Sequence, residues 1–222
     1  MNRDKIRKLV LYALFVAIII LMAFTPLGYL RLNPAMAITF ITIPVVIGAI
    51  ALGPLGGAVL GLVFGLTSFI QCFGLDVFGT ALFAIDPVGC AFTCIVPRVL
   101  MGFLTGVVAR VMLRAVKRDI FAYGAASLFG PIANTVLFMT SLMLFFGQSE
   151  AIMNLRGGME LFPFLAAFVG VNGLVEAIVC FIVCTAVCKA ISHYLPKWMG
   201  NGRAGENGPE TAPADNEESQ EK

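Results

Sequence analysis

The sequence predicts an all-α membrane protein with six transmembrane helices and both termini in the cytoplasm. Of its 222 residues, 59% are hydrophobic and 13% are charged, whereas an average soluble domain is about 25% charged. A membrane-spanning helix needs about 20 mostly apolar residues. Six apolar runs have about that length, at residues 9–26, 35–52, 55–73, 95–113, 121–146 and 161–191.

The positions of lysine and arginine agree with six spans and predict an orientation. In a six-span order, most basic residues fall on one side of the membrane: Arg3, Lys5, Arg7, Lys8, Arg110, Arg114, Lys117, Arg118, Lys189, Lys197, Arg203 and Lys222. The other side receives only Arg31, Arg98 and Arg156. Because the side rich in lysine and arginine faces the cytoplasm, we expect both termini there.

The composition divides the chain into three parts. Residues 1–8 form a basic cytoplasmic N-terminus, and residues 9–192 form the six-helix transmembrane domain. Residues 193–222 are rich in Gly, Asn, Glu and Pro and should be a cytoplasmic, largely disordered acidic tail. The segment 74–93, which precedes the fourth run, is too interrupted by polar residues to be a clean span.

Glycine and proline residues interrupt the apolar runs at several positions. A tight turn at Gly53-Pro54 joins the second and third runs, and Gly53, Gly57, Gly61 and Gly65 recur every four residues after it. Such a strip lets two helix backbones approach closely in a membrane, so we expect it to pack inside this protein. In the fifth run, Gly130-Pro131 should kink or locally open the helix, either to build a binding wall or simply to bend.

The six cysteines do not resemble a disulfide framework. Cys180, Cys184 and Cys188 share one helical face, and no histidine or acid completes a metal site nearby. Small packing residues are the preferred interpretation. The sequence has no GxxxxGK[ST] phosphate loop, no HExxH and no paired carboxylates in the spans. We therefore expect no enzyme, no bound cofactor and no nucleic-acid partner.

A few polar residues inside the apolar runs are the candidate binding groups. Glu176 and Asn172 lie one turn apart in the sixth run, and an ionisable residue inside a membrane is a functional-site hypothesis by default. Arg98 either neutralises a ligand carboxylate or pairs with Asp86 or Glu176 to join helices. For Asn134 and Asn172 ligand contact is favoured, and for Glu176 structural pairing is favoured.

In combination, these features resemble the substrate-binding S components of energy-coupling factor (ECF) vitamin transporters, over roughly residues 8–191. The matching segments are AITFITIPVVIGAI at 37–50, LGP at 52–54, GLTS at 65–68, IVPR at 95–98 with Gly102, Asn134-Thr135, and NGxxEA at 172–177. The resemblance implies an S-component-like bundle of six helices with a vitamin pocket near the outer face. It assigns that pocket Thr39, Arg98, Asn134, Thr135, Asn172 and Glu176.

The resemblance also implies partners and a mechanism. Ala13 and Ala17 match the family's AxxxA motif, which docks a membrane coupling subunit, although alone the pair would favour internal packing. Two cytoplasmic ATPase subunits would supply the energy, and the binding subunit would deliver its vitamin inward by toppling in the bilayer. The absence of a phosphate loop from this chain then follows.

Within that family, the sequence is most similar to the pantothenate-type branch. Pantothenate is a small anion with hydroxyls and an amide, which suits a pocket with one arginine and several amides and hydroxyls. Riboflavin or folate remains an alternative vitamin. A membrane scaffold whose polar residues only join helices, and a self-sufficient secondary transporter, are the alternatives from other classes.

Overall fold

The computed structural model describes residues 3–33, 36–116, 119–149, 153 and 161–194, with the side chains of 3–4, 27, 30–38, 161–172 and 193–194 left out. The long helices are α1 (Arg3–Ala23), α3 (Pro54–Gln71), α5 (Pro87–Ala115), α6 (Asp119–Phe146) and α8 (Leu161–Tyr194). Two shorter helices are α2 (Thr42–Leu52) and α4 (Val77–Ile85). The tail beyond residue 194 and the loop at 154–160 lie outside the described residues.

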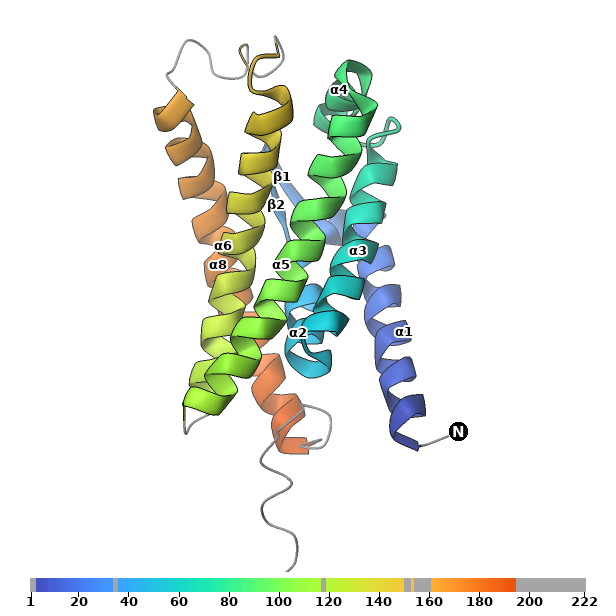
Figure 1. Ribbon diagram of the computed structural model, residues 1–222, viewed down its shortest axis with the longest axis vertical. Coiled ribbons are helices and arrows are strands. Elements are labelled where there is room, and N and C mark those ends of the chain that lie inside the picture. The colour runs from blue at the N-terminus through green and yellow to red at the C-terminus, as the bar shows by residue number, and fades with distance from the viewer. Residues whose placement is uncertain (1–2, 34–35, 117–118, 150–152, 154–160, 195–222) are drawn as a thin grey trace, which may run out of the picture.

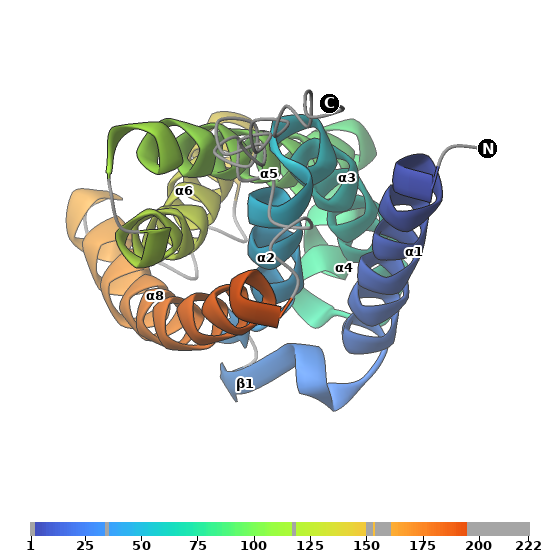
Figure 2. The same ribbon diagram turned by 90° about the horizontal axis from the view of Figure 1, so that it is seen from below.

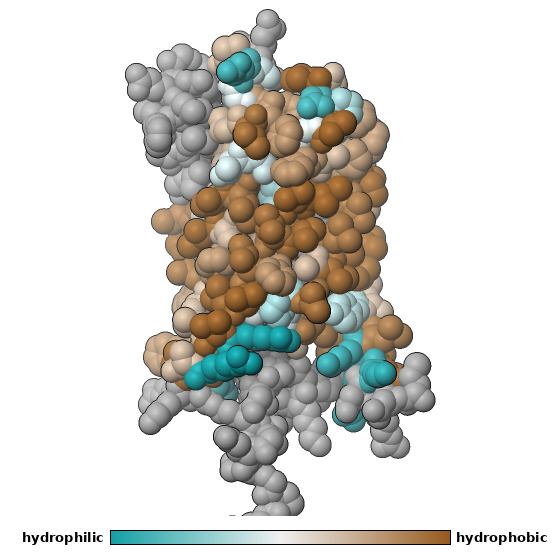
Figure 3. Space-filling model, viewed as in Figure 1, coloured by the Kyte–Doolittle hydropathy of each residue, from teal (hydrophilic) through white to brown (hydrophobic). Residues whose placement is uncertain are grey.

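The helices form an upright bundle with α4 at one end and the start of α1 at the other (Figure 1). Five described helices, α1, α3, α5, α6 and α8, contain segments long and apolar enough to cross a membrane. On the face shown in Figure 3, hydrophobic side chains cover the middle of the bundle, and hydrophilic ones gather toward its ends. This arrangement is that of a multi-pass membrane protein.

The second apolar run differs from its predicted form. Instead of one span over 35–52, the chain forms strands β1 (Tyr29–Asn33) and β2 (Met36–Thr39), paired antiparallel after the short turn η1 (Pro26–Gly28), and then α2. With 11 residues, α2 is about 16 Å long, roughly half the hydrocarbon thickness of a bilayer. Among the described residues, five helices are therefore long enough to span the membrane, and the predicted count of six is not confirmed.

The position of α2 explains why its sequence resembles a span. It contacts all five long helices and lies between them in the view along the bundle (Figure 2). Val45, Val46 and Ala49 are fully buried by this packing. A helix buried in protein and a helix facing lipid are equally apolar, so hydropathy alone does not separate them.

The segment 74–93, predicted not to be a clean span, contains the short helix α4 and the start of α5. The Asp76 carboxylate accepts a hydrogen bond from the Gly79 N–H at 2.8 Å and caps α4. The Asp86 carboxylate accepts from the Val88 N–H at 3.0 Å and caps α5, whose first residue is Pro87. Aspartate caps followed by proline are strong start signals. The Asp86 cap and Pro87 begin α5 eight positions before the expected start at residue 95.

The glycine strip packs inside the protein, as predicted. A Cβ atom on Gly57 would collide with the backbone carbonyl of Gly102, and one on Gly61 with the carbonyl of Arg98. At Gly65 the obstacle is the Cα atom of Ile95, at 2.8 Å. The backbones of α3 and α5 therefore touch along most of α3, which fixes the position of Arg98. Gly53 has φ +83° at the turn before α3, a conformation that favours glycine.

Two further predictions concern α6 and α8. Helix α6 continues through Pro131 without interruption, so the expected local opening is not seen. Gly130 instead gives room to α2, because a Cβ there would lie 2.5 Å from the side chain of Val46. Cys180, Cys184 and Cys188 are buried in the main core on the inner face of α8, which confirms their packing role.

Candidate functional site

Arg98 is the central charge of the candidate site. It lies in the first half of α5, the half nearer α4, and is only 8% exposed. Its Nη1 donates a hydrogen bond to the Thr93 carbonyl at 2.6 Å. The guanidinium carbon lies 4.6 Å from the ring centre of Phe138 on α6 and 5.5 Å from that of Phe64 on α3. Two aromatic faces thus hold the guanidinium plane between three helices.

The charge of Arg98 is not neutralised by an ion pair with any residue that the structure describes. Asp86 caps α5 instead, and Glu176 is hydrogen bonded to Thr42. The Nε–H of Arg98 is buried and has no hydrogen-bond partner among these residues. Burying a cation without a counter-ion is costly. The arrangement therefore favours an anionic ligand over a role in joining helices.

Glu176 is paired inside the protein, with Thr42 and not with Arg98. It is 6% exposed, and its Oε1 accepts a hydrogen bond from the Thr42 hydroxyl. Thr42 also donates to the Thr39 carbonyl at 3.0 Å. One short network thereby joins α8, the start of α2 and the end of β2. A hydroxyl has a single proton, so Thr42 donates to one of these two oxygens at a time.

Asn134 lies one turn before Phe138 on α6, on the helix face that meets Arg98. Its side chain is 8% exposed, and its Oδ1 is buried with no partner among the described residues. The neighbouring Thr135 hydroxyl donates to the Pro131 carbonyl at 3.0 Å, inside its own helix. Asn134 is therefore the freer group of the two for binding a ligand.

The remaining predicted residues, Thr39, Asn172, Ala13 and Ala17, lie at different distances from the cluster around Arg98 or are only partly described. Thr39 is half-buried and enters the network through its carbonyl. Asn172 belongs to α8, but its side chain lies outside the described residues. Ala13 and Ala17 are exposed on α1, away from the polar cluster. The structure thus brings together Arg98 and the Asn134 face in one group, and Thr39 and Glu176 in another.

Sequence reasoning missed three side chains of the site. Thr42 holds Glu176, and Phe64 and Phe138 hold Arg98. The signal for Phe138 was its spacing of four from Asn134. Thr42 follows Thr39 by three residues, which is the spacing of a threonine that bonds back to a carbonyl. Phe64 carries no local signal, because only the packing of α3 on α5 brings it to Arg98.

The hairpin adjoins the cluster, because β2 contacts α8 and the Thr39 carbonyl accepts a hydrogen bond from Thr42. Tyr29 of β1 pairs with Thr39 of β2. Burial raises the pKa of the Tyr29 phenol to about 12, against the opposing effects of the Arg98 charge and a hydrogen bond with Gln71. Gln71, the last residue of α3, donates in turn to the Ala23 carbonyl at the end of α1. These contacts attach the hairpin to the helices that carry the site.

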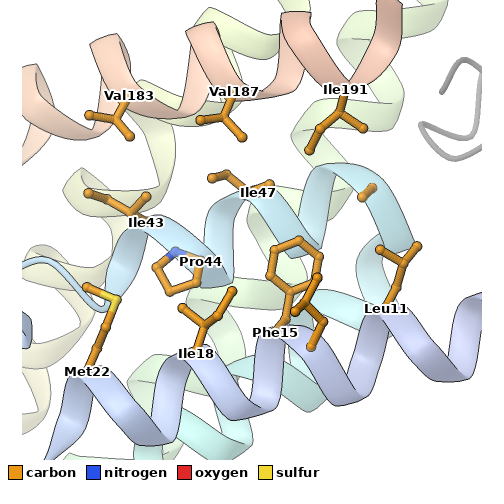
Figure 4. Close-up of a pocket in the computed structure, with 12 residues that line it drawn as sticks. Leu11, Phe15, Ile18, Met22, Ile43, Pro44, Ile47, Val183, Val187 and Ile191 are labelled. Carbon is orange, nitrogen blue, oxygen red and sulfur yellow. The ribbon is translucent and has the colours of Figure 1, made fainter. Parts of the chain in front are cut away.

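A separate groove of about 410 Å³ lies between α1, α2 and α8 (Figure 4). Its lining is entirely apolar: Leu11, Leu14, Phe15, Ile18, Met22, Ile43, Pro44, Ile47, Ala51, Val183, Val187 and Ile191. A hydroxylated anion would find no hydrogen-bond partner there. The apolar lining of the groove does not suit a polar ligand, whereas the cluster around Arg98 offers buried polar groups.

Comparison with known proteins identifies the family of this chain. Residues 7–188 match the family model described as "ECF transporter, substrate-specific component". The chain is also 30% identical over 190 residues to the pantothenic acid transporter PanT of Lactococcus lactis subsp. cremoris (strain MG1363), covering 81% of this chain and 90% of that protein. With its five apolar helices, it is a multi-pass protein of the bacterial cell membrane. The chain belongs to the substrate-specific components of ECF transporters.

Proposed function

We propose that this chain is the pantothenate-binding subunit of an ATP-driven ECF importer. The observation that supports this most directly is Arg98, a buried guanidinium with an unfilled Nε–H and no ion-pair partner among the described residues. A carboxylate ligand would supply the missing counter-charge. The similarity to PanT favours pantothenic acid among small carboxylates.

The other groups of the site match the rest of the pantothenate molecule. Arg98 binds the carboxylate through a fork of two N–H donors. Asn134, with a free Oδ1, accepts from the amide or a hydroxyl. Thr39, Thr135, Asn172 and Glu176 complete the polar lining. The apolar carbons of the ligand pack against Phe64 and Phe138, whose rings already flank the guanidinium.

The energy for import comes from partners. We propose a membrane coupling subunit and two cytoplasmic ATPase subunits, with the chain toppling in the bilayer to release its vitamin inside. The start of α1, the end of α5 and the end of α8, which carry the lysines and arginines, face the cytoplasm. Ala13 and Ala17 are exposed on α1 and offer the coupling subunit a surface of small residues.

The test is thermal unfolding of the purified, detergent-solubilised chain with a panel of vitamins. A ligand at 100 times its dissociation constant adds about 2.7 kcal/mol to stability. We expect a rise in melting temperature with pantothenate and none with riboflavin or folate. A rise only with another vitamin would keep the subunit class and discard the ligand. A folded sample that responds to no vitamin would contradict the proposal and favour a scaffold.

A further inference from the structure

Three buried cysteines lie together at the α4 end of the bundle. Cys72 directly follows α3, and Cys90 and Cys94 lie one turn apart on α5. All three are buried. Their sulfur atoms lie within 4.8 Å of one another, and those of Cys72 and Cys94 are 3.7 Å apart. We propose that Cys72, Cys90 and Cys94 form a binding site for a thiophilic divalent metal ion of the Zn²⁺ class.

The sulfur spacing fits a shared metal ion. Zinc–thiolate bonds are about 2.3 Å long, so two thiolates on one tetrahedral ion lie about 3.8 Å apart. Cys72 and Cys94 already have that separation. The third sulfur needs only a small side-chain adjustment to reach the same ion. Thiolates are soft ligands and select zinc and its heavier relatives over Mg²⁺ or Ca²⁺.

The surroundings of the sulfurs are closely packed. A Cβ atom on Gly79 of α4 would lie 2.7 Å from the Cys72 sulfur, and Cys90 contacts the Gly79 carbonyl at 3.9 Å. Around the cysteines, Leu82, Met139, Leu142 and Phe146 form a small apolar core. A metal ion here would join the end of α3 to α5 beside α4. It would therefore fix the segment that precedes Arg98.

Charge favours a divalent ion. Each cysteine loses its proton on binding, so three thiolates and one M²⁺ leave a net charge of about −1, with three protons released. Cys90, Cys94 and Arg98 are spaced four apart on one face of α5. The positive charge of Arg98 thus lies one turn beyond the metal–thiolate group. A monovalent ion would leave one more negative charge in the same apolar surroundings.

The second cysteine group provides a control. Cys180 and Cys184 have sulfurs 3.3 Å apart, but no third ligand joins them among the described residues. Both groups are buried and apolar, so a purely packing role would make them equivalent. The metal proposal predicts ion binding at Cys72, Cys90 and Cys94 and none at Cys180 and Cys184, because only the first group brings three sulfur atoms together.

The experiment uses the full chain without a histidine tag, reduced with a phosphine and kept free of oxygen. Zn²⁺ and Cd²⁺ are titrated against a chromophoric chelator, and cadmium–sulfur charge-transfer absorption is recorded. We expect one ion per chain. We expect at least tenfold weaker binding in Cys94→Ser and Cys72→Ser, and unchanged binding in Cys184→Ser. The melting temperature with and without vitamin checks that each variant is folded.

X-ray absorption of the zinc-loaded parent chain keeps the test valid even if a serine variant does not fold. Three sulfur neighbours at about 2.3 Å are expected. Binding that is lost in Cys184→Ser but kept in Cys94→Ser would overturn the proposal, as would a reduced chain that binds no ion. A Cys72–Cys94 disulfide in air, found together with no metal binding after reduction, would show a redox pair instead.

Discussion

At the scale of single residues, Arg98 is the group on which ligand binding should depend most. Replacing it by methionine in Arg98→Met keeps the apolar stem between Phe64 and Phe138 and removes the charge. A hydrogen bond to a charged group is worth about 1.5–3 kcal/mol, and 1.4 kcal/mol is tenfold in affinity. We expect pantothenate affinity, measured by isothermal titration calorimetry, to fall at least tenfold.

A matched variant separates the charge from general effects of the substitution. Arg114→Met makes the same change in the last turn of α5, where the side chain is exposed, and should leave affinity unchanged. The ligand-free melting temperature of Arg98→Met should fall only modestly, because the substitution removes the hydrogen bond to the Thr93 carbonyl but breaks no ion pair among the described residues. A marked fall in that temperature, with affinity unchanged, would mean that Arg98 only stabilises the helices.

Thr42 and Glu176 should behave as a coupled pair. Thr42→Val removes the hydroxyl and leaves a buried carboxyl without its partner, which costs about 1–3 kcal/mol of unfolding free energy. In the double variant Thr42→Val with Glu176→Leu, the carboxyl is removed as well and only the Thr39 carbonyl loses a donor, so part of the loss should be recovered. Thermal unfolding of the two single variants and the double variant gives the coupling. Additive losses would show that the contact contributes nothing.

At the scale of elements, the contact between α3 and α5 should tolerate no added atoms. Gly57→Ala places a methyl group against the Gly102 carbonyl, and backbone on both sides must shift. We expect a loss of about 1–3 kcal/mol of stability. Val59→Ile adds one carbon on the exposed face of the same helix, where Val59 is 46% exposed, and should be neutral. Equal melting temperatures for both variants would contradict this close approach.

The elements also show where sequence patterns were sufficient. Glycines spaced by four predicted the packed face of α3, because close backbone approach requires the absence of side chains at that period. The apolar run 35–52 did not predict the hairpin and α2, because apolar composition reports burial without saying whether lipid or protein provides it. The caps at Asp76 and Asp86 were readable from sequence. The prediction for this segment concerned only whether it could span the membrane and did not use these caps.

At the scale of the whole molecule, binding and transport should separate. Large side chains in the double variant Ala13→Leu with Ala17→Leu would fill the small-residue surface of α1 without touching the polar cluster. We expect the thermal shift with pantothenate to persist, while uptake of labelled pantothenate into vesicles that hold the coupling and ATPase subunits is largely lost. Val136→Leu on the exposed face of α6 is the control. Uptake that survives in the double variant would exclude this docking surface.

The sequence by itself determined the class of molecule and most of its helices. Long apolar runs, sparse charge and the glycine period are local properties, and the bilayer and helix geometry act on them directly. It also identified Arg98, Asn134 and Glu176, because polar groups stand out in an apolar run. The tertiary structure alone decided that Glu176 pairs with Thr42, that Arg98 lacks an ion-pair partner among the described residues, that α2 is central, and that three cysteines meet. Each of these depends on which helices become neighbours, and contacts between distant segments leave no local pattern in the chain.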